Sequence, residues 1–329
     1  MLSGDDVRAA VSMAEAVEVV RGAFRALSAG GATVPLRVGL SMPDGVSLFM
    51  PAYLQGSAGA KVVSVHAGNT DRGLPVIHAV VLVLDPETGQ LRALLDGTWL
   101  TALRTGAAGG VAADLLARPS ARVATIFGAG AQARTQLQAL RVVRPIQEVR
   151  LVSRSGSSAQ RWADELQATT GKGPGGSAEG ALRVRVMTDR AEAVAGADVV
   201  VAATDSAEPV FPGGAVEAGT HVTGVGSFTP EMREVDKTLL RRARIFVDER
   251  RAALEEAGEL IQALGSGALE PGDIVGEIGA VVAGELAGRT SEDEITYFKS
   301  VGNAVQDVAV ARRVLEVAEE RGLGTTVRL

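Results

Sequence analysis

The first third of the chain changes from a helical to a strand-like pattern of apolar residues. Ser12 and Glu15 have the spacing of a helix capping box, and apolar residues follow at positions 17, 20, 24 and 27. Alternating apolar and polar residues then predict a strand over residues 36–40. Further strands are predicted over residues 46–50, 60–66, 76–85 and 91–95, with turn signals at 43–45 and 86–89. Thr98 is placed to cap a helix that runs to about Ala117. This part of the chain is therefore expected to be an α+β domain.

Beyond Arg118, Pro119 and Ser120, strands and helices alternate regularly. Such alternation is typical of a parallel sheet with helical crossovers. The expected strands lie at residues 123–127, 148–152, 183–187, 198–203, 221–225 and 244–247. A last strand at 295–299 is expected to lie beyond the sheet, and the helix at 303–320 to return to the first domain. Residues 171–180 are expected to be a glycine-rich loop.

Together these patterns predict an α/β fold with a discontinuous first domain. The chain has 329 residues, of which 46% are hydrophobic, which is enough for two domains. Residues 119–302 are expected to form a Rossmann-type, doubly wound parallel sheet. Residues 1–118, completed by 303–329, are expected to form the α+β domain.

Composition excludes several classes of function. The chain has no cysteine and only three histidines, so we expect neither a disulfide nor a metal site. A net charge of −6 with 3% aromatic residues argues against nucleic acid as a partner. No apolar stretch is long enough for a membrane span, and the first residues lack the pattern of a signal peptide. We therefore expect a cytoplasmic protein that binds a small molecule.

The stretch after residue 122 has the form of a dinucleotide-binding turn. An apolar strand, 123–127, leads into Gly128 and Gly130, and a helical segment follows Ala131 and Gln132. The first glycine permits a tight turn, and the second lets a pyrophosphate approach the backbone at the start of a helix. The alternative is a glycine turn without a ligand. The strand before it and the helix after it favour a nucleotide.

The end of the second strand of this sheet indicates which nicotinamide cofactor is used. An acidic residue there would bind the ribose 2′-hydroxyl of NAD, whereas an arginine suits the 2′-phosphate of NADP. This chain has Ser153 and Arg154 and no carboxylate at that place. The pattern favours NADP(H), because a guanidinium can bind phosphate through two hydrogen bonds. NAD(H) stays possible, and Arg154 could also be an ordinary surface residue.

Three basic residues of the first domain stand among apolar neighbours. They are Arg37, Lys61 and Arg104. A cation in such surroundings either reaches water or meets an anion, because burial without a partner is costly. Each could be an ordinary solvated or ion-paired residue, and the pattern alone cannot bring the three together.

Six segments resemble, in order along the chain, the ornithine cyclodeaminase and mu-crystallin family. They are Phe49–Tyr53, Gly59–Val63, Leu100–Thr105, Gly128–Ala133, Gly224–Pro230 with Glu234, and Phe298–Gly302. The resemblance implies a homodimer whose first domain supplies the subunit contacts and the substrate pocket, beside a Rossmann domain for the nicotinamide cofactor. It also implies that Arg37, Lys61 and Arg104 bind a substrate carboxylate and that Thr105 binds a cofactor phosphate.

The family contains several activities, and position 228 discriminates among them. Its cyclodeaminases and its alanine dehydrogenase carry an aspartate in the matching loop, where this chain has Phe228. Loss of that carboxylate removes a candidate base, which disfavours a reaction on a free amine. The loop 226–234 instead resembles that of bacterial Δ1-pyrroline-2-carboxylate reductases.

We therefore predict reduction of a cyclic ketimine acid, Δ1-pyrroline-2-carboxylate or Δ1-piperideine-2-carboxylate, to L-proline or L-pipecolate. Lys61 would either support protonation of the imine or only bind the carboxylate, and Phe228 would pack over the substrate ring. The alternatives are an ornithine cyclodeaminase, an amino-acid dehydrogenase and a crystallin-like binding protein without turnover.

Overall fold

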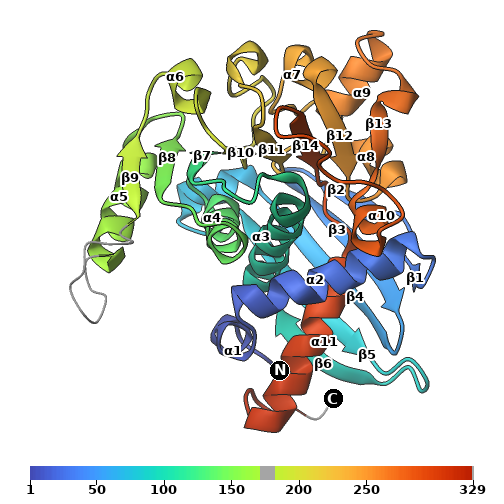
Figure 1. Cartoon of the computed structure of the whole chain (residues 1–329). Coiled ribbons are helices and arrows are strands. Elements are labelled where there is room, and N and C mark those ends of the chain that lie inside the picture. Colours follow the sequence, from blue (N-terminus) through green and yellow to red (C-terminus); the bar gives the residue numbers. More distant parts are fainter. Residues whose placement is uncertain (171–181, 328–329) are drawn as a thin grey trace. The chain divides into compact units, whose positions relative to one another are not determined.

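The computed structural model describes residues 1–170 and 182–327, and Figure 1 traces the chain through two compact units. Unit 1 comprises Met1–Ala107 and Gly302–Leu329, and unit 2 comprises Ala108–Val301. The division falls inside helix α3 (Gly97–Leu116), not at residue 118, so the domain limits inferred from the sequence stay a prediction. The expected loop at 171–180 lies outside the described residues.

Unit 1 is built on an antiparallel sheet in the order β1-β3-β4-β5-β6, with β2 paired to β3 at one edge. Ser12 and Glu15 form the predicted capping box of α2, and a second box, Ser3 with Asp6, begins a helix that the apolar pattern did not reveal. The elements are α1 (Gly4–Ala10), α2 (Met13–Ser28), β1 (Ala32–Thr33), β2 (Val38–Met42), β3 (Gly45–Leu54), β4 (Ser57–Val65), η1 (Ala67–Arg72), β5 (Ile77–Leu84), β6 (Leu91–Asp96) and α11 (Ala304–Arg321).

The two faces of this sheet have different surroundings. Helix α11 packs against one face of the sheet and buries a row of paired residues there. This row consists of Met50, Lys61, Val81 and Leu95. Neighbouring strand residues point to opposite faces, so the adjacent row lies on the other side. That row includes Val38, Phe49 and Val80, with 64%, 41% and 37% of their surface exposed. The apolar positions of β2 therefore belong to an open face of the sheet and not to its buried face.

Helix α3 begins differently from the prediction. Thr98 lies inside the helix, where its Oγ1 accepts a hydrogen bond of 3.2 Å from the backbone N–H of Ala79. The carboxylate of Asp96 accepts instead from the N–H of Trp99, at 2.8 Å. The prediction that Thr98 caps this helix was wrong, since an acidic side chain two residues earlier takes that position.

Unit 2 contains an eight-stranded parallel sheet in the order β13-β12-β14-β11-β10-β7-β8-β9. Its strands are β7 (Val123–Phe127), β8 (Glu148–Val152), β9 (Arg183–Val186), β10 (Val199–Ala202), β11 (His221–Gly224), β12 (Ala243–Val247), β13 (Ile274–Glu277) and β14 (Ile295–Lys299). The prediction that residues 295–299 lie beyond the sheet was wrong, because β14 pairs with both β11 and β12. Strand β13 was missed, and it lies at the edge.

Side chains on both faces of this sheet pack into apolar cores. In β10, Val199 and Val201 contribute to one core, and Val200 and Ala202 contribute to the other. The helical segments are α4 (Ala131–Val143), α5 (Ser157–Thr170), α6 (Arg190–Val194), η2 (Gly213–Ala215), α7 (Lys237–Arg242), α8 (Arg250–Glu256), α9 (Gly258–Gly265), η3 (Pro271–Asp273) and α10 (Ile278–Ala283). A parallel sheet buried on both faces is the doubly wound arrangement, so the predicted α/β fold class is confirmed.

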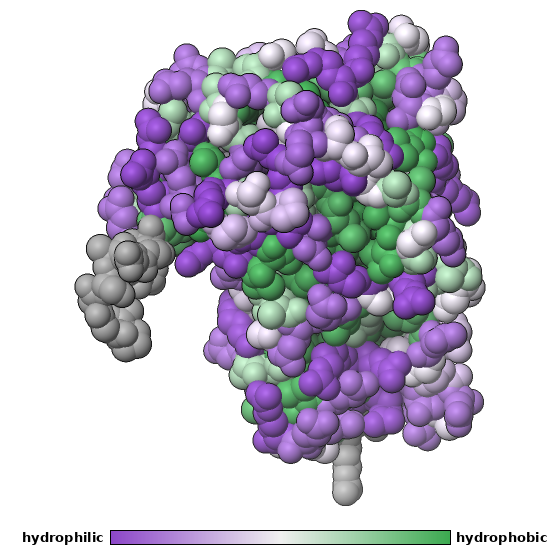
Figure 2. Space-filling view, viewed as in Figure 1, coloured by the Kyte–Doolittle hydropathy of each residue, from purple (hydrophilic) through white to green (hydrophobic). Residues whose placement is uncertain are grey.

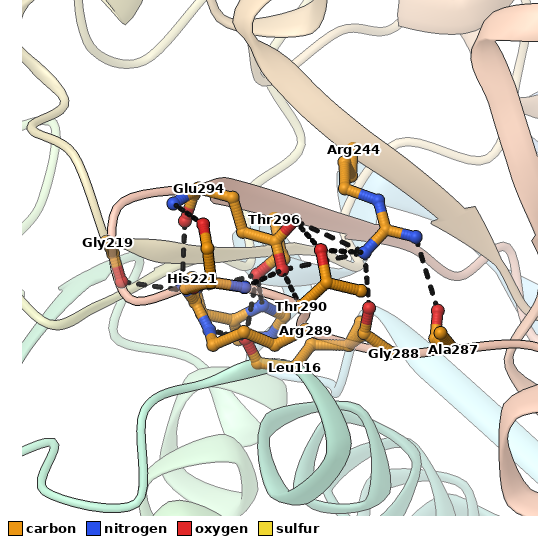
Figure 3. A network of polar contacts seen from close by, with 11 residues as sticks. Leu116, Gly219, His221, Arg244, Ala287, Gly288, Arg289, Thr290, Glu294 and Thr296 are labelled. Carbon is orange, nitrogen blue, oxygen red and sulfur yellow. Dashed lines mark hydrogen bonds and ion pairs between the residues drawn. The ribbon is translucent and has the colours of Figure 1, made fainter.

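A polar network ties together the amino ends of β11 and β14 (Figure 3). The guanidinium of Arg289 donates to the carbonyls of Leu116 and Gly219 at 2.7 and 3.0 Å. The ring of His221 lies between the hydroxyls of Thr296 and Thr223, at 2.9 Å from each. Burial, with the nearby charge of Arg289, lowers the pKa of His221 to about 3. This histidine is therefore a neutral structural residue at physiological pH.

Charged and polar residues cover most of the molecular face seen in Figure 2, with apolar patches between them. Among residues 1–170 and 182–327, no helix has both the length and the apolar character that crossing a membrane requires.

Candidate active site

A cluster of buried charged residues lies in unit 1, where β4, α3 and α11 meet. Lys61 and Arg104 have 1% and 5% of their surface exposed, and Asp307 is fully buried. The Nζ of Lys61 lies 2.8 Å from Oδ2 of Asp307, and the Nε of Arg104 donates to Oδ1 at 2.9 Å. One carboxylate thus holds both cations in place.

Arg37 joins this cluster through the backbone of Gly302. Its Nη2 donates to the carbonyl of Gly302 at 2.7 Å. Gly302 has a φ of +81°, and a Cβ added there would lie 2.6 Å from Nη1 of Arg104. Both guanidiniums therefore approach the same glycine, which leads directly into α11. The three basic residues that the sequence left separate converge in the structure.

The cluster carries more positive than negative charge. Burial, together with the positive charges of Arg104 and Arg37, lowers the pKa of Lys61 to about 7, although Asp307 opposes this effect. Excess positive charge in a buried place favours binding of an anion. A carboxylate fits the planar guanidinium groups well.

Asp307 and Gln306 were not found from the sequence. The side-chain oxygen of Gln306 accepts from Nη1 of Arg104 at 3.1 Å, so two successive residues of α11 orient this guanidinium. A signal was available, because the pair interrupts the otherwise apolar stretch 304–311, all of which is buried. An acidic residue in such a stretch needs a cationic partner.

Thr105 follows Arg104 on α3 and is buried, with 7% of its surface exposed. It belongs to unit 1, whereas the predicted dinucleotide turn and Phe228 belong to unit 2.

The predicted dinucleotide turn joins β7 to α4 in unit 2. Gly128 has a φ of +108°, and a Cβ there would lie 2.4 Å from the carbonyl oxygen of Ala203, so only glycine fits. Around Gly130 there is open space, with no atom within 4 Å of an added Cβ. Gly130 is also the N-cap of α4, and no side chain caps the helix. Ala131 and Gln132 form its first turn. The exposed N–H groups there suit the pyrophosphate of a dinucleotide.

A cavity of about 490 Å³ adjoins this turn at the carboxyl ends of β7, β8 and β10. Strands β8 and β10 lie on opposite sides of β7, so the cavity lies where the strand order reverses, as is typical of nucleotide sites. Ser153 and Arg154 line it. The hydroxyl of Ser153 accepts from the N–H of Ala159 at 3.1 Å, and Nη2 of Arg154 lies 3.0 Å from Asp205.

The loop that carries Phe228 is held by the buried carboxylate of Glu234, and Glu259 supports it from another side. The carboxylate of Glu234 accepts hydrogen bonds from the backbone N–H groups of Thr204, Gly226 and Ser227. Burial raises the pKa of Glu234. Phe228 itself is half-buried. The hydrogen bonds from Gly226 and Ser227 to Glu234 thus fix the backbone that leads into Phe228.

A second buried ion pair supports the same loop from β14 and α9. The Nζ of Lys299 lies 3.1 Å from Oε1 of Glu259, and it donates to the backbone carbonyl of Ser227 at 2.7 Å. The hydroxyl of Ser227 donates to Glu259. Sequence reasoning singled out neither Lys299 nor Glu259 as a site residue. Both residues lie outside the dinucleotide turn, and both form hydrogen bonds with Ser227.

Other parts of the described structure offer less chemistry. A cavity of about 410 Å³ in unit 1 lies near the chain start and the end of α11, where its charged residues Arg92 and Glu319 pair with each other at 2.8 Å. Within residues 1–170 and 182–327, no group of three histidine or acidic residues could hold a metal ion.

Comparison with known proteins places similar chains among nicotinamide-dependent enzymes. The profile of the ornithine cyclodeaminase/mu-crystallin family matches residues 1–322. A Δ1-pyrroline-2-carboxylate reductase of Bacillus cereus is 36% identical, with 99% of each chain covered. An alanine dehydrogenase of Archaeoglobus fulgidus is 38% identical, with 100% of this chain and 98% of the other covered.

Solved structures agree with these matches. The Δ1-pyrroline-2-carboxylate reductase of Thermococcus litoralis, in complex with NADH and L-proline, superposes with a TM-score of 0.93 at 38% identity, covering 99% of each chain. An archaeal alanine dehydrogenase dimer with bound NAD has a TM-score of 0.92 at 38% identity, covering 99% of this chain and 98% of the other.

Proposed function

The chain belongs to the ornithine cyclodeaminase/mu-crystallin family, and on that premise we propose that it is an NAD(P)H-dependent reductase of cyclic ketimine acids. Its substrate is Δ1-pyrroline-2-carboxylate, Δ1-piperideine-2-carboxylate or both, and its product is L-proline or L-pipecolate. The observation that carries the proposal is the convergence of Arg37, Lys61 and Arg104 in a chain that also has a dinucleotide turn.

The guanidiniums of Arg37 and Arg104 anchor the substrate carboxylate. The side chains of Asp307 and Gln306 accept hydrogen bonds from Arg104, so its guanidinium is oriented before the substrate binds. Fixing the carboxylate also orients the adjacent imine carbon, which is the hydride acceptor. Orientation is the main requirement, because a protonated C=N bond accepts hydride readily.

Lys61 is the candidate catalytic residue. A pKa of about 7 allows its Nζ to hold or release a proton near neutral pH. It would share that proton with the imine nitrogen. The competing role, binding of the carboxylate alone, requires only the charged form, and replacement by arginine separates the two.

The nicotinamide supplies the hydride when the cofactor is bound. Gly128, Gly130, Ala131 and Gln132 bind its pyrophosphate through the turn and the first N–H groups of α4, and Thr105 binds a cofactor phosphate. NADPH is preferred over NADH because Ser153 and Arg154 line the cavity at the end of β8. Use of NADH is also expected, since the Thermococcus reductase was solved with NADH.

Phe228 favours imine reduction over the other activities of the family. Its ring would pack over the apolar ring of the substrate, and it offers no base for a free amine. An amino-acid dehydrogenase is the second candidate, because the Archaeoglobus relative of that name is 38% identical. An ornithine cyclodeaminase and a binding protein without turnover are less well supported.

The chain is also proposed to form a homodimer through the open face of the unit 1 sheet. Val38, Phe49, Tyr53 and Val80 expose apolar surface there, and such a patch is typical of a subunit interface. The archaeal alanine dehydrogenase structure is described as a dimer. Sedimentation should give a dimer, and Val38→Glu should shift it toward the monomer. A monomeric wild-type protein would refute this assembly.

The function is tested by following NADPH and NADH absorbance with each candidate substrate. Oxidation with at least one cyclic imine, at a rate well above that with pyruvate plus ammonia, is expected. Ornithine with NAD should release no ammonia. Arg104→Ala should lose imine reduction but keep cofactor binding, whereas Arg92→Ala, on the exposed side of unit 1, should retain both. Failure to oxidise cofactor with either imine would refute the proposal.

A further inference from the structure

The cofactor cavity of unit 2 contains an arginine that the cofactor-binding pattern does not include. Arg190 is the first residue of α6, which follows β9, and it lines the same cavity as Arg154. The sequence signal for cofactor choice concerns only the end of β8. Arg190 instead lies where β9 leads into α6, so this signal does not include it.

The side chain of Arg190 has no hydrogen bond or ion pair with any residue in the described ranges 1–170 and 182–327. Other arginine side chains of this sheet form hydrogen bonds within the protein. Arg150, for example, donates to the carbonyls of Ala193 and Ala195, at the other end of the same helix. An exposed guanidinium that lines a cavity and has no anionic partner can receive one from a ligand.

The second arginine of the cavity is held only weakly. The ion pair of Arg154 with Asp205 measures 3.0 Å, but 81% and 85% of the two side chains are exposed. Exposed pairs of this kind contribute little to stability. Asp205 comes from the loop after β10, so the sequence around β8 does not reveal it. A stronger anion could displace this carboxylate from Arg154.

We propose that Arg190 and Arg154 together bind the 2′-phosphate of NADPH, and that Asp205 is an internal anion that the phosphate displaces. Ser155 and Ser158 line the same cavity and supply hydroxyl donors. Two guanidiniums match the charge of a phosphate monoester, which approaches −2 at neutral pH. This inference rests on the proposed use of a nicotinamide cofactor and explains how the chain selects the phosphorylated form.

The first test measures binding of NADPH and NADH to the full chain by fluorescence titration. Arg190→Ala should weaken NADPH about tenfold and leave NADH within about twofold, because only NADPH carries the phosphate. Arg190→Lys should recover part of the loss. Arg141→Ala removes an exposed arginine of α4 that does not line the cavity and should change neither affinity.

Asp205 provides a test in the opposite direction. Asp205→Asn removes the competing anion, so NADPH should bind a few times more tightly while NADH is unchanged. Equal weakening of both cofactors by Arg190→Ala would place this arginine against the adenosine and overturn the proposal. No effect of Arg190→Ala on either cofactor would overturn it as well.

A substrate-free probe separates this proposal from the proposed reaction. Adenosine 2′,5′-bisphosphate carries the 2′-phosphate without a nicotinamide, and 5′-AMP lacks that phosphate. Selective binding of the bisphosphate, lost in Arg190→Ala, would support the subsite even if no imine were reduced. Reduction of an imine with equal use of NADPH and NADH, unaffected by Arg190→Ala, would refute the subsite and leave the reaction standing.

Discussion

The ammonium of Lys61 and the carboxylate of Asp307 lie 2.8 Å apart inside unit 1, although 246 positions separate them in the sequence. Burying an ion pair costs desolvation of both charges, which close geometry and further hydrogen bonds must offset. Arg104 supplies one such hydrogen bond to the same carboxylate. The carboxylate therefore fixes two cations and leaves an excess of positive charge in the cluster, which suits the carboxylate of the proposed substrate.

The activity should depend on pH through Lys61. Burial and Arg104 lower its pKa to about 7, so the ammonium is charged below that pH and neutral above it. We expect kcat/KM for the cyclic imine to fall above about pH 7, and Lys61→Arg to remove this titration because a guanidinium stays charged. Initial rates at saturating NADPH between about pH 6 and about pH 9 test this. An identical profile in the variant would exclude Lys61 as the titrating group.

Replacement of Asp307 should destabilise the protein in a pH-dependent manner. Asp307→Asn leaves Lys61 and Arg104 without their buried anion, which costs about 3 kcal/mol of unfolding free energy. The loss should be larger at pH 6 than at pH 9, because Lys61 can shed its proton at high pH. Urea denaturation measures both values. Glu320→Gln, on the exposed side of the same helix, is the control and should change stability little.

Gly302 should be intolerant of a side chain. Gly302→Ala places a methyl group 2.6 Å from the Arg104 guanidinium and strains a backbone with a φ of +81°. Displacement of Arg104 should raise KM for the imine about tenfold, equivalent to about 1.4 kcal/mol. Dissociation constants for NADPH, measured in parallel, should not change. A variant with wild-type KM would show that Arg104 does not contact the substrate.

His221 should make the protein sensitive to acid. Its pKa of about 3 in the folded state lies below the usual value of 6.5, so the unfolded chain binds a proton first as pH falls. Stability should therefore fall by about 2 kcal/mol between pH 6.5 and pH 5 from this residue alone. Urea denaturation of His221→Gln should show a shallower dependence than wild type. His78→Gln, at an exposed position, should follow the wild type.

The dinucleotide turn was predictable because its requirements are local. The strand 123–127, the two glycines and the helix start are neighbours in sequence, and each restricts the backbone at its own position. The bounds of β14 were also predictable for this reason. Its place in the sheet was not, because strand order depends on which edges pair, and periodicity within one strand carries no information about its neighbours.

The amino-acid sequence by itself determined the α/β class, the glycine turn and the basic residues Arg37, Lys61 and Arg104. Only the tertiary structure decided that these cations converge on Gly302 and Asp307, and that Arg190 and Asp205 line the cavity of Arg154. The physical reason is that local spacing sets backbone conformation and the faces of helices and strands. The electrostatic partner of a charged side chain is chosen by proximity in the folded chain, where residues from distant segments share a low-dielectric environment.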